Sequence, residues 1–482
     1  STDSRPDSRM VSRSGTAASW PPPPARIATH PPWDGRPAAW SGSAHDACDL
    51  APLRVLREFR FPPHTDPDLP HVTLFVLAVF TVTYAGMALG RFPGLRIDRT
   101  GIALVAAILM LAGGALDSGQ VAGAVDFPTL FILFGLMILS AQFASAGFYD
   151  WCALRIARAG RSPQALLAVT VAVGGGLSAV LANDVVVFAM TPMLCAGLRG
   201  RGLDPRPYLI ALAGAANAGS AATLIGNPQN IVIGQVGGLD FWRFLAACGV
   251  PALVALACVF FTVSLVWRGR LTDPGKAAFA DLPEPDLDRW QLGKALAATA
   301  ALMVMFATPI PHEVGVLLIA GMLLISRSLE SRRMVGMVDW PLLVLFACLF
   351  AINSALERTG LPAEAVAALT SAGLLPDRLA VLAPLSVVAS NTIGNVPAVV
   401  LLLAVWPQPP EGAMYGLALL STLAGNLLIL GSLANIIVVE RARAAGVRLG
   451  FLEHARCGIP MTAFSLGFAC VWLWATGLMP LK

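Results

Sequence analysis

Apolar runs long enough to cross a lipid bilayer recur along this chain and constrain its fold more than any other feature. The runs at 72–90, 241–267 and 458–477 match the roughly 20 residues that a helix needs to span hydrocarbon. Composition agrees, since 56% of the residues are hydrophobic and only 13% are charged, against about a quarter charged in a soluble domain. Because lipid offers no hydrogen bonds to an open sheet edge, the sequence predicts an all-α integral membrane protein.

Two apolar segments, 164–198 and 379–405, differ from the others because a cluster of polar residues interrupts each in the middle. The segment at 1–70 differs again. It is rich in Pro, Ser, Arg and Asp and contains no apolar run, so a disordered tail is expected there. The remaining spans are expected near 72–90, 101–116, 129–147, 209–236, 242–267, 292–308, 313–326, 341–357, 414–439 and 458–480.

The second half of the chain repeats the first. Segment 126–147 aligns with 339–360 without a gap and places Asp126 on Asp339, and a similar shift places Asn230 on Asn435 and aligns the two interrupted segments. Polar residues that fall on polar residues in order, at a nearly constant shift, indicate an internal duplication. The predicted organisation is a tail at 1–70, a first repeat at 72–267 with a hairpin at 164–198 and a broken helix at 209–236, a cytoplasmic linker at 268–291, and a second repeat at 292–482 with a hairpin at 379–405 and a broken helix at 414–439.

The basic residues indicate how these repeats lie in the membrane, because Arg and Lys favour the cytoplasmic side of short loops. Segment 164–198 has basic loops at both ends, so we expect a re-entrant hairpin that enters from the cytoplasm. Segment 379–405 is flanked by loops poor in basic residues, so its hairpin is expected to enter from outside. Each repeat then has about five transmembrane helices and one hairpin, and the odd number of crossings inverts the second repeat. One group of charges disagrees with this orientation. The basic residues Arg54, Arg57 and Arg60 of the tail have to lie outside, where basic residues are disfavoured.

Four polar breaks fall at matched places in the repeats: LANDVV at 181–186, IGNPQN at 225–230, SNTIGNVP at 390–397 and LGSLAN at 430–435. Each break exposes helix ends, whose N–H groups suit an anion and whose carbonyls suit a cation such as sodium. Simple kinks, with Asn and Ser bonded to neighbouring helices, would use the same residues. Four breaks in repeat-related pairs favour a binding site. The residues expected to line it are Asn183, Asp184, Asn227, Asn230, Ser390, Asn391, Thr392, Asn395, Asn426, Ser432 and Asn435.

Asp184 is the one carboxylate clearly inside an apolar segment, and its counterpart in the second repeat is Val396. An acid at that depth is costly and therefore indicates a function. Asp184 is expected to carry a coupling proton, to bind sodium, or to cap a helix at the hairpin tip. No Lys or Arg is expected deep in a span, so helix dipoles and amides would hold an anionic substrate.

Other chemistries find no support in the sequence. The eight cysteines are scattered without a CxxC pair, and the six histidines lack metal-ligand spacing. No metal site is expected, and no cofactor other than Na⁺ or H⁺ as a coupling ion. The net charge of +4 comes from arginines and lysines in loops, which excludes a nucleic-acid surface. No P-loop and no nucleophile–base arrangement is present, so neither ATP-driven transport nor an enzyme is expected.

At these motifs the sequence resembles the ion transporter superfamily of arsenite permeases, NhaD-type sodium/proton antiporters, divalent-anion/sodium symporters and citrate-type anion permeases. ANDVVVFAMTP at 182–192, IGNPQNIVIG at 225–234, SNTIGNVPAVVLL at 390–402 and STLAGNLLILGSLANIIVVE at 421–440 look most like its uncharacterised anion-permease branch. SNT at 390–392 matches the symporters' signature, whereas the first repeat has no SNT. The resemblance covers nearly everything after residue 70. It implies an elevator-like motion of a domain that contains the hairpins and broken helices, against scaffold helices that offer a homodimer interface.

The residues and the resemblance together predict a secondary active transporter that moves a small anion, either an inorganic oxyanion or a carboxylate, coupled to H⁺ or Na⁺. Three alternatives stay open. They are an arsenite or antimonite efflux permease, a sodium/proton antiporter and, from another class, a passive channel or a membrane scaffold. The expected partners are the small anionic or oxyanion substrate and the lipid bilayer, and the expected location is the inner (cytoplasmic) membrane, crossed many times.

Overall fold

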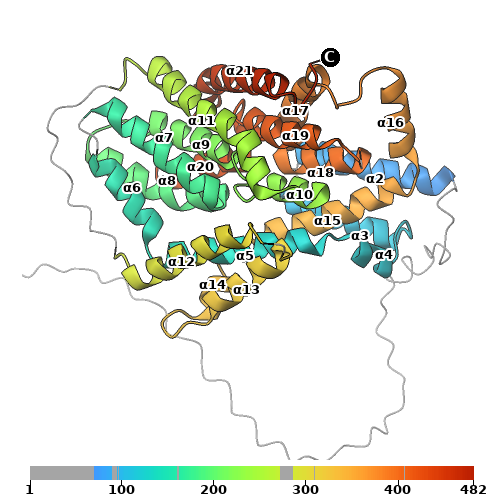
Figure 1. The fold of residues 1–482 in the computed structure, drawn as a ribbon, viewed down its shortest axis with the longest axis horizontal. Coiled ribbons are helices and arrows are strands. Elements are labelled where there is room, and N and C mark those ends of the chain that lie inside the picture. The colour runs from blue at the N-terminus through green and yellow to red at the C-terminus, as the bar shows by residue number, and fades with distance from the viewer. Residues whose placement is uncertain are drawn as a thin grey trace, which may run out of the picture. The chain divides into compact units, whose positions relative to one another are not determined.

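The computed structural model describes residues 70–89, 95, 97–159, 162–271, 286–308, 310–406 and 408–481. All of them belong to one compact unit, Arg60–Lys482. Within these ranges every regular element is a helix and no strand occurs, so the predicted all-α fold is confirmed (Figure 1). The expected tail, apart from residue 70, lies outside the described residues, as does most of the expected linker.

Length and composition allow many of these helices to cross a membrane. Four shorter apolar helices, Arg99–Ala112, His312–Leu324, Leu379–Ile393 and Asn395–Val405, accompany the long ones. Within the described ranges, the six helices that are long and apolar enough to span are His71–Leu89, Phe127–Ser145, Pro163–Val180, Phe241–Val266, Trp340–Glu357 and Phe451–Ala475.

The helices of the two halves correspond one to one in chain order. The first half contains α2 (Pro70–Leu89), α3 (Arg99–Ala112), α4 (Ser118–Ala124), α5 (Phe127–Ser145), α6 (Phe148–Ala159), α7 (Pro163–Val180), α8 (Asn183–Gly200), α9 (Arg206–Ser220), α10 (Pro228–Gly237) and α11 (Phe241–Val266). The second half contains α12 (Arg289–Met305), α13 (His312–Leu324), α14 (Ser331–Val335), α15 (Trp340–Glu357), α16 (Leu361–Ser371), α17 (Leu379–Ile393), α18 (Asn395–Val405), α19 (Glu411–Ala424), α20 (Leu433–Ala444) and α21 (Phe451–Ala475), with a short 3₁₀ turn, η1 (Ile429–Gly431), before α20.

The packing of the helices follows the same correspondence. α3 packs on α15 as α13 packs on α5, α8 packs on α20 as α18 packs on α10, and α11 packs on α21. In each of these contacts, equivalent helices of the two halves exchange places. A two-fold axis that relates the halves produces this exchange, and inverted repeats are related by such an axis. The inverted-repeat architecture is therefore confirmed, while the residue boundaries of the repeats stay a prediction.

Two aspartates at repeat-related positions cap the starts of equivalent helices. Asp126 caps α5 by accepting a hydrogen bond from the backbone N–H of Thr129, and Asp339 caps α15 in the same way through Leu342. A proline occupies the first turn of each helix, where its fixed φ suits the helix and its missing N–H is no loss. The gapless self-match at this point thus reflects the same helix start used twice.

The two interrupted segments form helix–turn–helix hairpins, as predicted. Hairpin 1 consists of α7 and α8 and turns just before Asn183, and hairpin 2 consists of α17 and α18 and turns at Gly394. Gly394 has φ +95°, a conformation that glycine adopts without the steric cost of a side chain. A single residue therefore connects the two helices of hairpin 2.

Residues 148–163 and 358–378 lie between the segments expected to enter the membrane and were therefore expected to be loops, and this expectation was wrong. They contain the repeat-related helices α6 and α16. α6 is too short to span, but it places Tyr149, Ala153 and Ile156 at helical spacing in the core and packs on α8. Arg155 lies over the ring of Trp151 on its other side, 5.1 Å from the ring centroid. The search for span-length apolar runs could not find an amphipathic helix of this kind.

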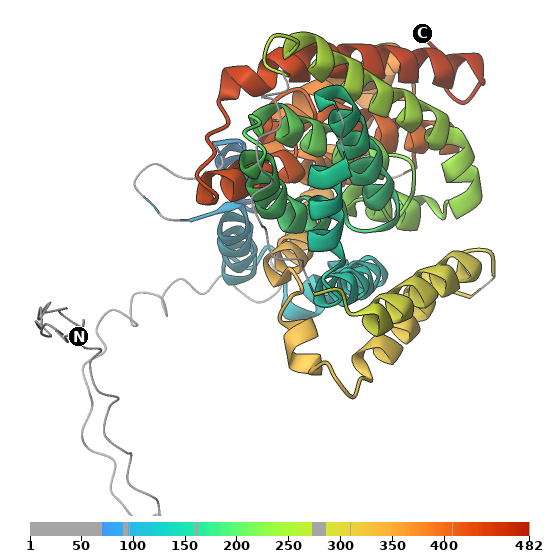
Figure 2. The same ribbon diagram turned by 90° about the vertical axis from the view of Figure 1, so that its left-hand side faces the viewer.

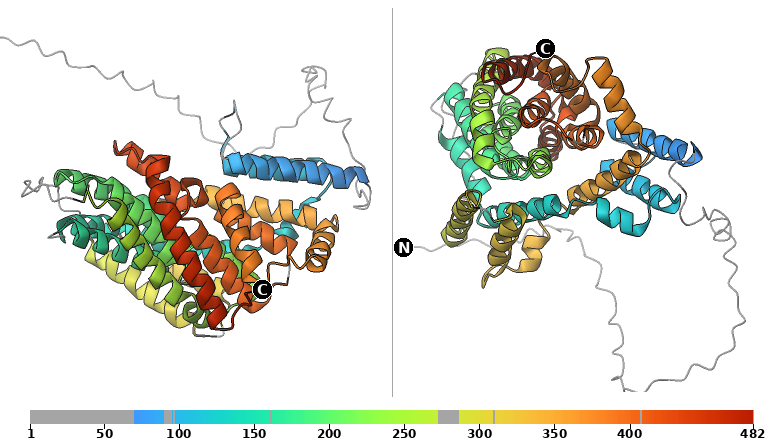
Figure 3. Two further views of the ribbon diagram at one scale, coloured as in Figure 1. Left: turned by 90° about the horizontal axis from the view of Figure 1, so that it is seen from above. Right: turned by 45° about the vertical axis from the view of Figure 1, so that its right-hand side comes forward.

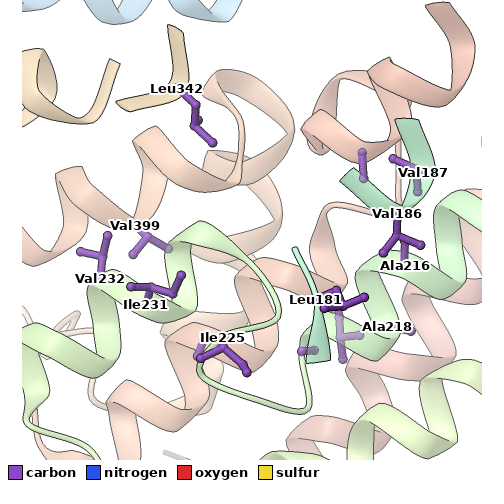
Figure 4. Packing of buried hydrophobic residues seen from close by; sticks show 14 of the residues in the cluster. Leu181, Val186, Val187, Ala216, Ala218, Ile225, Ile231, Val232, Leu342 and Val399 are labelled. Atoms are coloured by element: carbon purple, nitrogen blue, oxygen red, sulfur yellow. The ribbon is translucent and has the colours of Figure 1, made fainter. Parts of the chain in front are cut away.

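The helices form two groups, which we call group I and group II. Group I contains α2–α5 and α12–α15, and group II contains α7–α11 and α17–α21. Figures 1 and 2 show α12 and α13 beside α5 in group I, and both views of Figure 3 show the helices of group II packed closely together. Apolar side chains connect helices from both halves; for example, Ile231 and Val232 of α10 lie beside Val399 of α18 (Figure 4).

Glycines allow α7 and α9 to approach closely within group II. A Cβ atom added at Gly219 of α9 would clash with the backbone carbonyl of Gly175 in α7. Small residues permit such backbone contact between membrane helices, where packing replaces the hydrophobic effect as the source of association. The neighbouring Gly176 points elsewhere, because an added Cβ would meet nothing within 4 Å.

We predict that Gly219→Ala destabilises the folded protein because the added methyl group has to push α7 and α9 apart. Overpacking of this kind costs about 1–3 kcal/mol, so the melting temperature in detergent should fall. Gly176→Ala is the matched control and should leave the melting temperature unchanged or slightly raised. Equal melting temperatures for the two variants would contradict the packing described here.

Candidate functional site

The four polar breaks converge on one cavity of about 400 Å³. It lies between the helix groups, since both contribute to its wall. Group I supplies Asp98, Arg99, Thr100, Asp339, Pro341, Leu342 and Leu345. Group II supplies Asn183, Asp184, Pro228, Gln229, Gly394, Asn395, Val396, Pro397, Leu430, Ser432, Leu433, Ile436, Ile437 and Glu440.

The tips of the two hairpins bring repeat-related asparagines to this cavity. Asn183 begins α8 and Asn395 begins α18, and their side chains are only 4% and 6% exposed. The Oδ1 atom of each is buried and has no hydrogen-bond partner among the described residues. A buried acceptor left unpaired costs about 1–3 kcal/mol. Both oxygens are therefore suited to a donor group or a cation that enters the cavity.

Behind the cavity, Asn217 of α9 joins the first repeat to the break in the second. Its Oδ1 accepts a hydrogen bond from Oγ of Ser432 at 2.8 Å, and its Nδ2 donates to Oδ1 of Asn435 at 3.2 Å. The same Nδ2 lies 2.8 Å from Oδ1 of Asn426. Asn217 is fully buried, so these bonds form out of contact with solvent or lipid.

Thr422 of α19 joins the second repeat to the break in the first. Its Oγ accepts a hydrogen bond from Nδ2 of Asn227 at 3.3 Å and from Nε2 of Gln229 at 3.1 Å. It donates to Oδ1 of Asn230 at 3.5 Å. The alignment that places Asn230 on Asn435 also places Asn217 on Thr422, so the two sets of bonds are repeat-related. We call them the cross-repeat bonds.

Asn230 and Asn435 also hold the unwound backbone of the breaks. Each uses its Nδ2 group to bond two backbone carbonyl oxygens at its own break, and the same alignment relates the two pairs of carbonyls. Asn230 donates to Ser220 at 3.2 Å and Thr223 at 2.9 Å, and Asn435 donates to Gly425 at 2.8 Å and Leu428 at 3.1 Å. Both side chains are fully used by the protein itself.

Acidic groups outnumber basic ones on the cavity wall. Asp98, Asp184, Asp339 and Glu440 line it together with one cation, Arg99. Asp98 and Asp339 are helix caps, accepting hydrogen bonds from backbone N–H groups of α3 and α15. Asp184 and Asp339 also share a neighbouring cavity of about 30 Å³. A proton or cation near these two carboxylates would relieve their mutual repulsion.

The structure brings four of the predicted site residues to the cavity: Asn183, Asp184, Asn395 and Ser432. The other seven do not line it. Asn227 reaches only the smaller cavity, and Thr392 is exposed and bonds to the carbonyl of Val388 in its own helix. Asn227, Asn230, Asn426 and Asn435 take part in the cross-repeat bonds, and Ser390 and Asn391 bond to backbone carbonyls of α19, at Ser421 and Ala424. Whether any of these residues binds a solute stays a prediction.

No Arg or Lys was expected deep in a span, and Arg99, at the start of α3, was not among the predicted site residues although it lines the cavity. Its position in a basic sequence between two apolar runs suggested an ordinary loop residue. The residue instead begins α3, and its side chain points into the cavity wall. Asn217 and Thr422 were also missed, although each is a polar residue in an apolar helix and the internal alignment pairs them.

A multi-pass, all-helical fold of two related halves, with hairpin tips and broken helices around one polar cavity, defines this protein as a membrane transporter. A family model described as CitMHS, citrate transporter, matches residues 75–409. The chain belongs to this family.

Two relatives and one solved structure are also similar to this chain. An uncharacterised transporter of Mycobacterium tuberculosis is 28% identical over 432 residues, which cover 84% of this chain and 98% of that protein. The silicon efflux transporter LSI3 of Oryza sativa subsp. japonica is 27% identical over 467 residues, covering 82% of this chain and 96% of that protein. The crystal structure of the YdaH transporter of Alcanivorax borkumensis superposes with a TM-score of 0.53 at 16% identity, covering 86% of this chain and 100% of that chain. This last likeness concerns the fold alone.

We predict that alanine at Asn230 and alanine at Asn395 have different effects on stability. Asn230→Ala leaves two carbonyl oxygens in the break unsatisfied and should lower the free energy of unfolding by about 1–3 kcal/mol. Asn395→Ala removes an oxygen that has no partner among the described residues, so its melting temperature in detergent should stay close to that of the unmodified protein. A larger loss for Asn395→Ala than for Asn230→Ala would contradict this assignment.

Proposed function

We propose that this protein is a secondary active transporter that moves a small anion, either an inorganic oxyanion or a carboxylate, across the inner membrane, coupled to H⁺ or Na⁺. The observation that carries the proposal is the cavity of about 400 Å³ between the helix groups, into which both hairpin tips and both broken helices of the described chain lead. The family's description names citrate, so a carboxylate is the first substrate to test.

The excess of acidic groups supports coupling to a cation. Two like charges 4 Å apart repel by about 4 kcal/mol at an effective dielectric constant of about 20. An anion would meet this repulsion from Asp184 and Asp339 unless a cation entered with it. A proton or sodium ion bound at Asp184 would lower that cost, and the anion and the cation would then travel in the same direction.

The position of the cavity supports an elevator-type motion. Asn183, Asn395 and Ser432 belong to group II, whereas Arg99 and Asp339 belong to group I. Movement of group II along group I would carry the hairpin tips with their solute and would leave the group I residues behind. The homodimer through scaffold helices that the sequence resemblance implies stays a prediction.

The acidic wall also favours a second candidate, sodium/proton antiport, in which the carboxylates bind Na⁺ and H⁺ in turn. The two functions separate in proteoliposomes that contain the purified protein. An imposed pH gradient should drive sodium flux without any organic anion if the protein is an antiporter. A pH gradient or a sodium gradient should drive accumulation of a labelled anion if the protein is a symporter.

The deciding experiment measures uptake of labelled citrate, sulfate, phosphate and arsenite, with sodium and pH gradients varied separately. Concentrative, saturable uptake of an anion that depends on one of these gradients supports the proposal. Export or uptake of arsenite alone would support the efflux alternative. Flux that neither saturates nor concentrates the solute would indicate a passive channel, and no flux of any solute would indicate a scaffold.

We predict that Asp184→Asn abolishes concentrative uptake while exchange of labelled for unlabelled anion across the membrane persists. The amide keeps the shape of the side chain but can neither gain nor lose a proton, so the driving ion is uncoupled from the anion. Glu330→Gln, which changes an exposed acid before α14, is the control and should behave as the unmodified protein. Retention of gradient-driven accumulation by Asp184→Asn would exclude Asp184 as the coupling residue.

A further inference from the structure

Arg99 stands out among the cavity residues because no described residue forms an ion pair with it. The Nη2 atom of its guanidinium group is buried and has no hydrogen-bond partner among the described residues. The residues that line the same cavity include four acids, yet none of those described forms an ion pair with Arg99. Arg99 as a whole is partly buried, and a ligand that pairs with its buried nitrogen would satisfy it.

The backbone of Arg99 is held firmly in place. Asp98 caps the start of α3 by accepting from the N–H of Gly101 at 2.8 Å, and Oγ of Thr100 donates to the carbonyl of Pro341 at 3.3 Å. Further along the helix, Ile102 and Ala103 are buried in the core. The side chain therefore leaves from a fixed point on group I, with little freedom to find another partner.

Its guanidinium group lies beside the tip of hairpin 2. A Cβ atom added at Gly394 would come within 3.1 Å of Nη1 and 3.8 Å of Cζ. Gly394 precedes α18, an eleven-residue helix that no side chain caps. The positive end of the α18 dipole and the guanidinium group thus face the same space, an arrangement that is unfavourable unless an anion lies between them.

We infer that Arg99 binds the anionic group of the transported solute, together with the amino end of α18, and so selects carboxylates and oxyanions over neutral solutes. The planar guanidinium fork matches the two oxygens of a carboxylate or an oxyanion. This inference rests on the proposed anion transport. It narrows the substrate to anions, because a guanidinium group in the site would not favour an uncharged solute such as a neutral hydroxide. It also assigns the anion contact to the present arrangement of the helix groups, in which the tip of hairpin 2 lies beside the side chain of Arg99.

The repeat-related position provides a built-in comparison. The alignment that places Asp126 on Asp339 also places Arg99 on His312, the first residue of α13. His312 does not line the large cavity and instead lies near a small one of about 20 Å³ beside α10. Of these two equivalent positions, only the one in the first half therefore places an arginine at the large cavity.

The test compares Arg99→Gln and Arg99→Lys with the controls His312→Gln and Arg333→Gln, the latter at an exposed site on α14. Melting temperatures in detergent, with and without citrate or sulfate, establish folding and report anion binding. Uptake of labelled citrate and sulfate in proteoliposomes gives KM values. We expect Arg99→Gln to fold, to lose the stabilisation by citrate, and to raise KM for citrate at least tenfold. Arg99→Lys should recover part of this loss, because it keeps the charge without the fork, and both controls should match the unmodified protein.

Three results would overturn the inference. If the unmodified protein takes up an anion and Arg99→Gln does so with unchanged KM and unchanged preference for anions over arsenite, the inference fails and the proposed function stands. If the unmodified protein shows neither anion uptake nor stabilisation by any anion tested, both fail. If Arg99→Gln and Arg99→Lys do not fold, the anion-dependent melting shift of Gly394→Ala decides. A methyl group there crowds the guanidinium group, and an unchanged shift would overturn the inference.

Discussion

The cross-repeat bonds are the interaction on which the rest of this structure depends. A helix that unwinds inside a membrane leaves backbone groups that lipid cannot satisfy. Here Asn230 and Asn435 satisfy carbonyl oxygens of their own breaks, and Thr422 and Asn217 of the opposite repeat hold those two side chains in place. Each break is therefore completed by the other half of the protein. The cavity can form only when both repeats are folded and joined, which makes assembly of the halves and formation of the site one event.

This arrangement divides the polar residues into two kinds. Asn230, Asn435 and Asn217 have most of their hydrogen-bonding groups occupied by the protein, and they give the breaks a fixed shape. Among the described residues, Asn183 and Asn395 each keep an unpaired oxygen at the hairpin tips, and Arg99 of group I keeps an unpaired nitrogen. The fixed residues position the unpaired ones, and a solute that carries both a negative group and an associated cation fits the groups that remain.

Much of the fold was predictable from the sequence, because in a membrane the apolar runs, the basic loops and the internal shift each report directly on helices and their orientation. The hairpins and broken helices lie where the polar interruptions predicted them. The short helices α6 and α16 were missed, since they neither span nor interrupt a span. For the site, the sequence named residues at the breaks but could not separate Asn183, which faces the cavity, from Asn230, which bonds to backbone. Both residues are asparagines in polar breaks, and only the three-dimensional structure shows which groups each side-chain amide contacts. Arg99 was missed for a related reason, since a basic residue near the end of a span has the same local pattern whether it faces solvent or turns inward.

The duplication is imperfect where charge is concerned. Asp184 corresponds to Val396, and Arg99 corresponds to His312. A transporter with identical inverted halves would have two end states of equal energy, each the rotated image of the other. Charged groups contributed by one half only remove this equality, and in the proposed elevator motion a charge carried by group II would cross part of the membrane field, worth up to about 2.3 kcal/mol per elementary charge for every 100 mV. In the proposed transport cycle, the same departures from symmetry that supply the binding groups would therefore set the energies of the two end states apart.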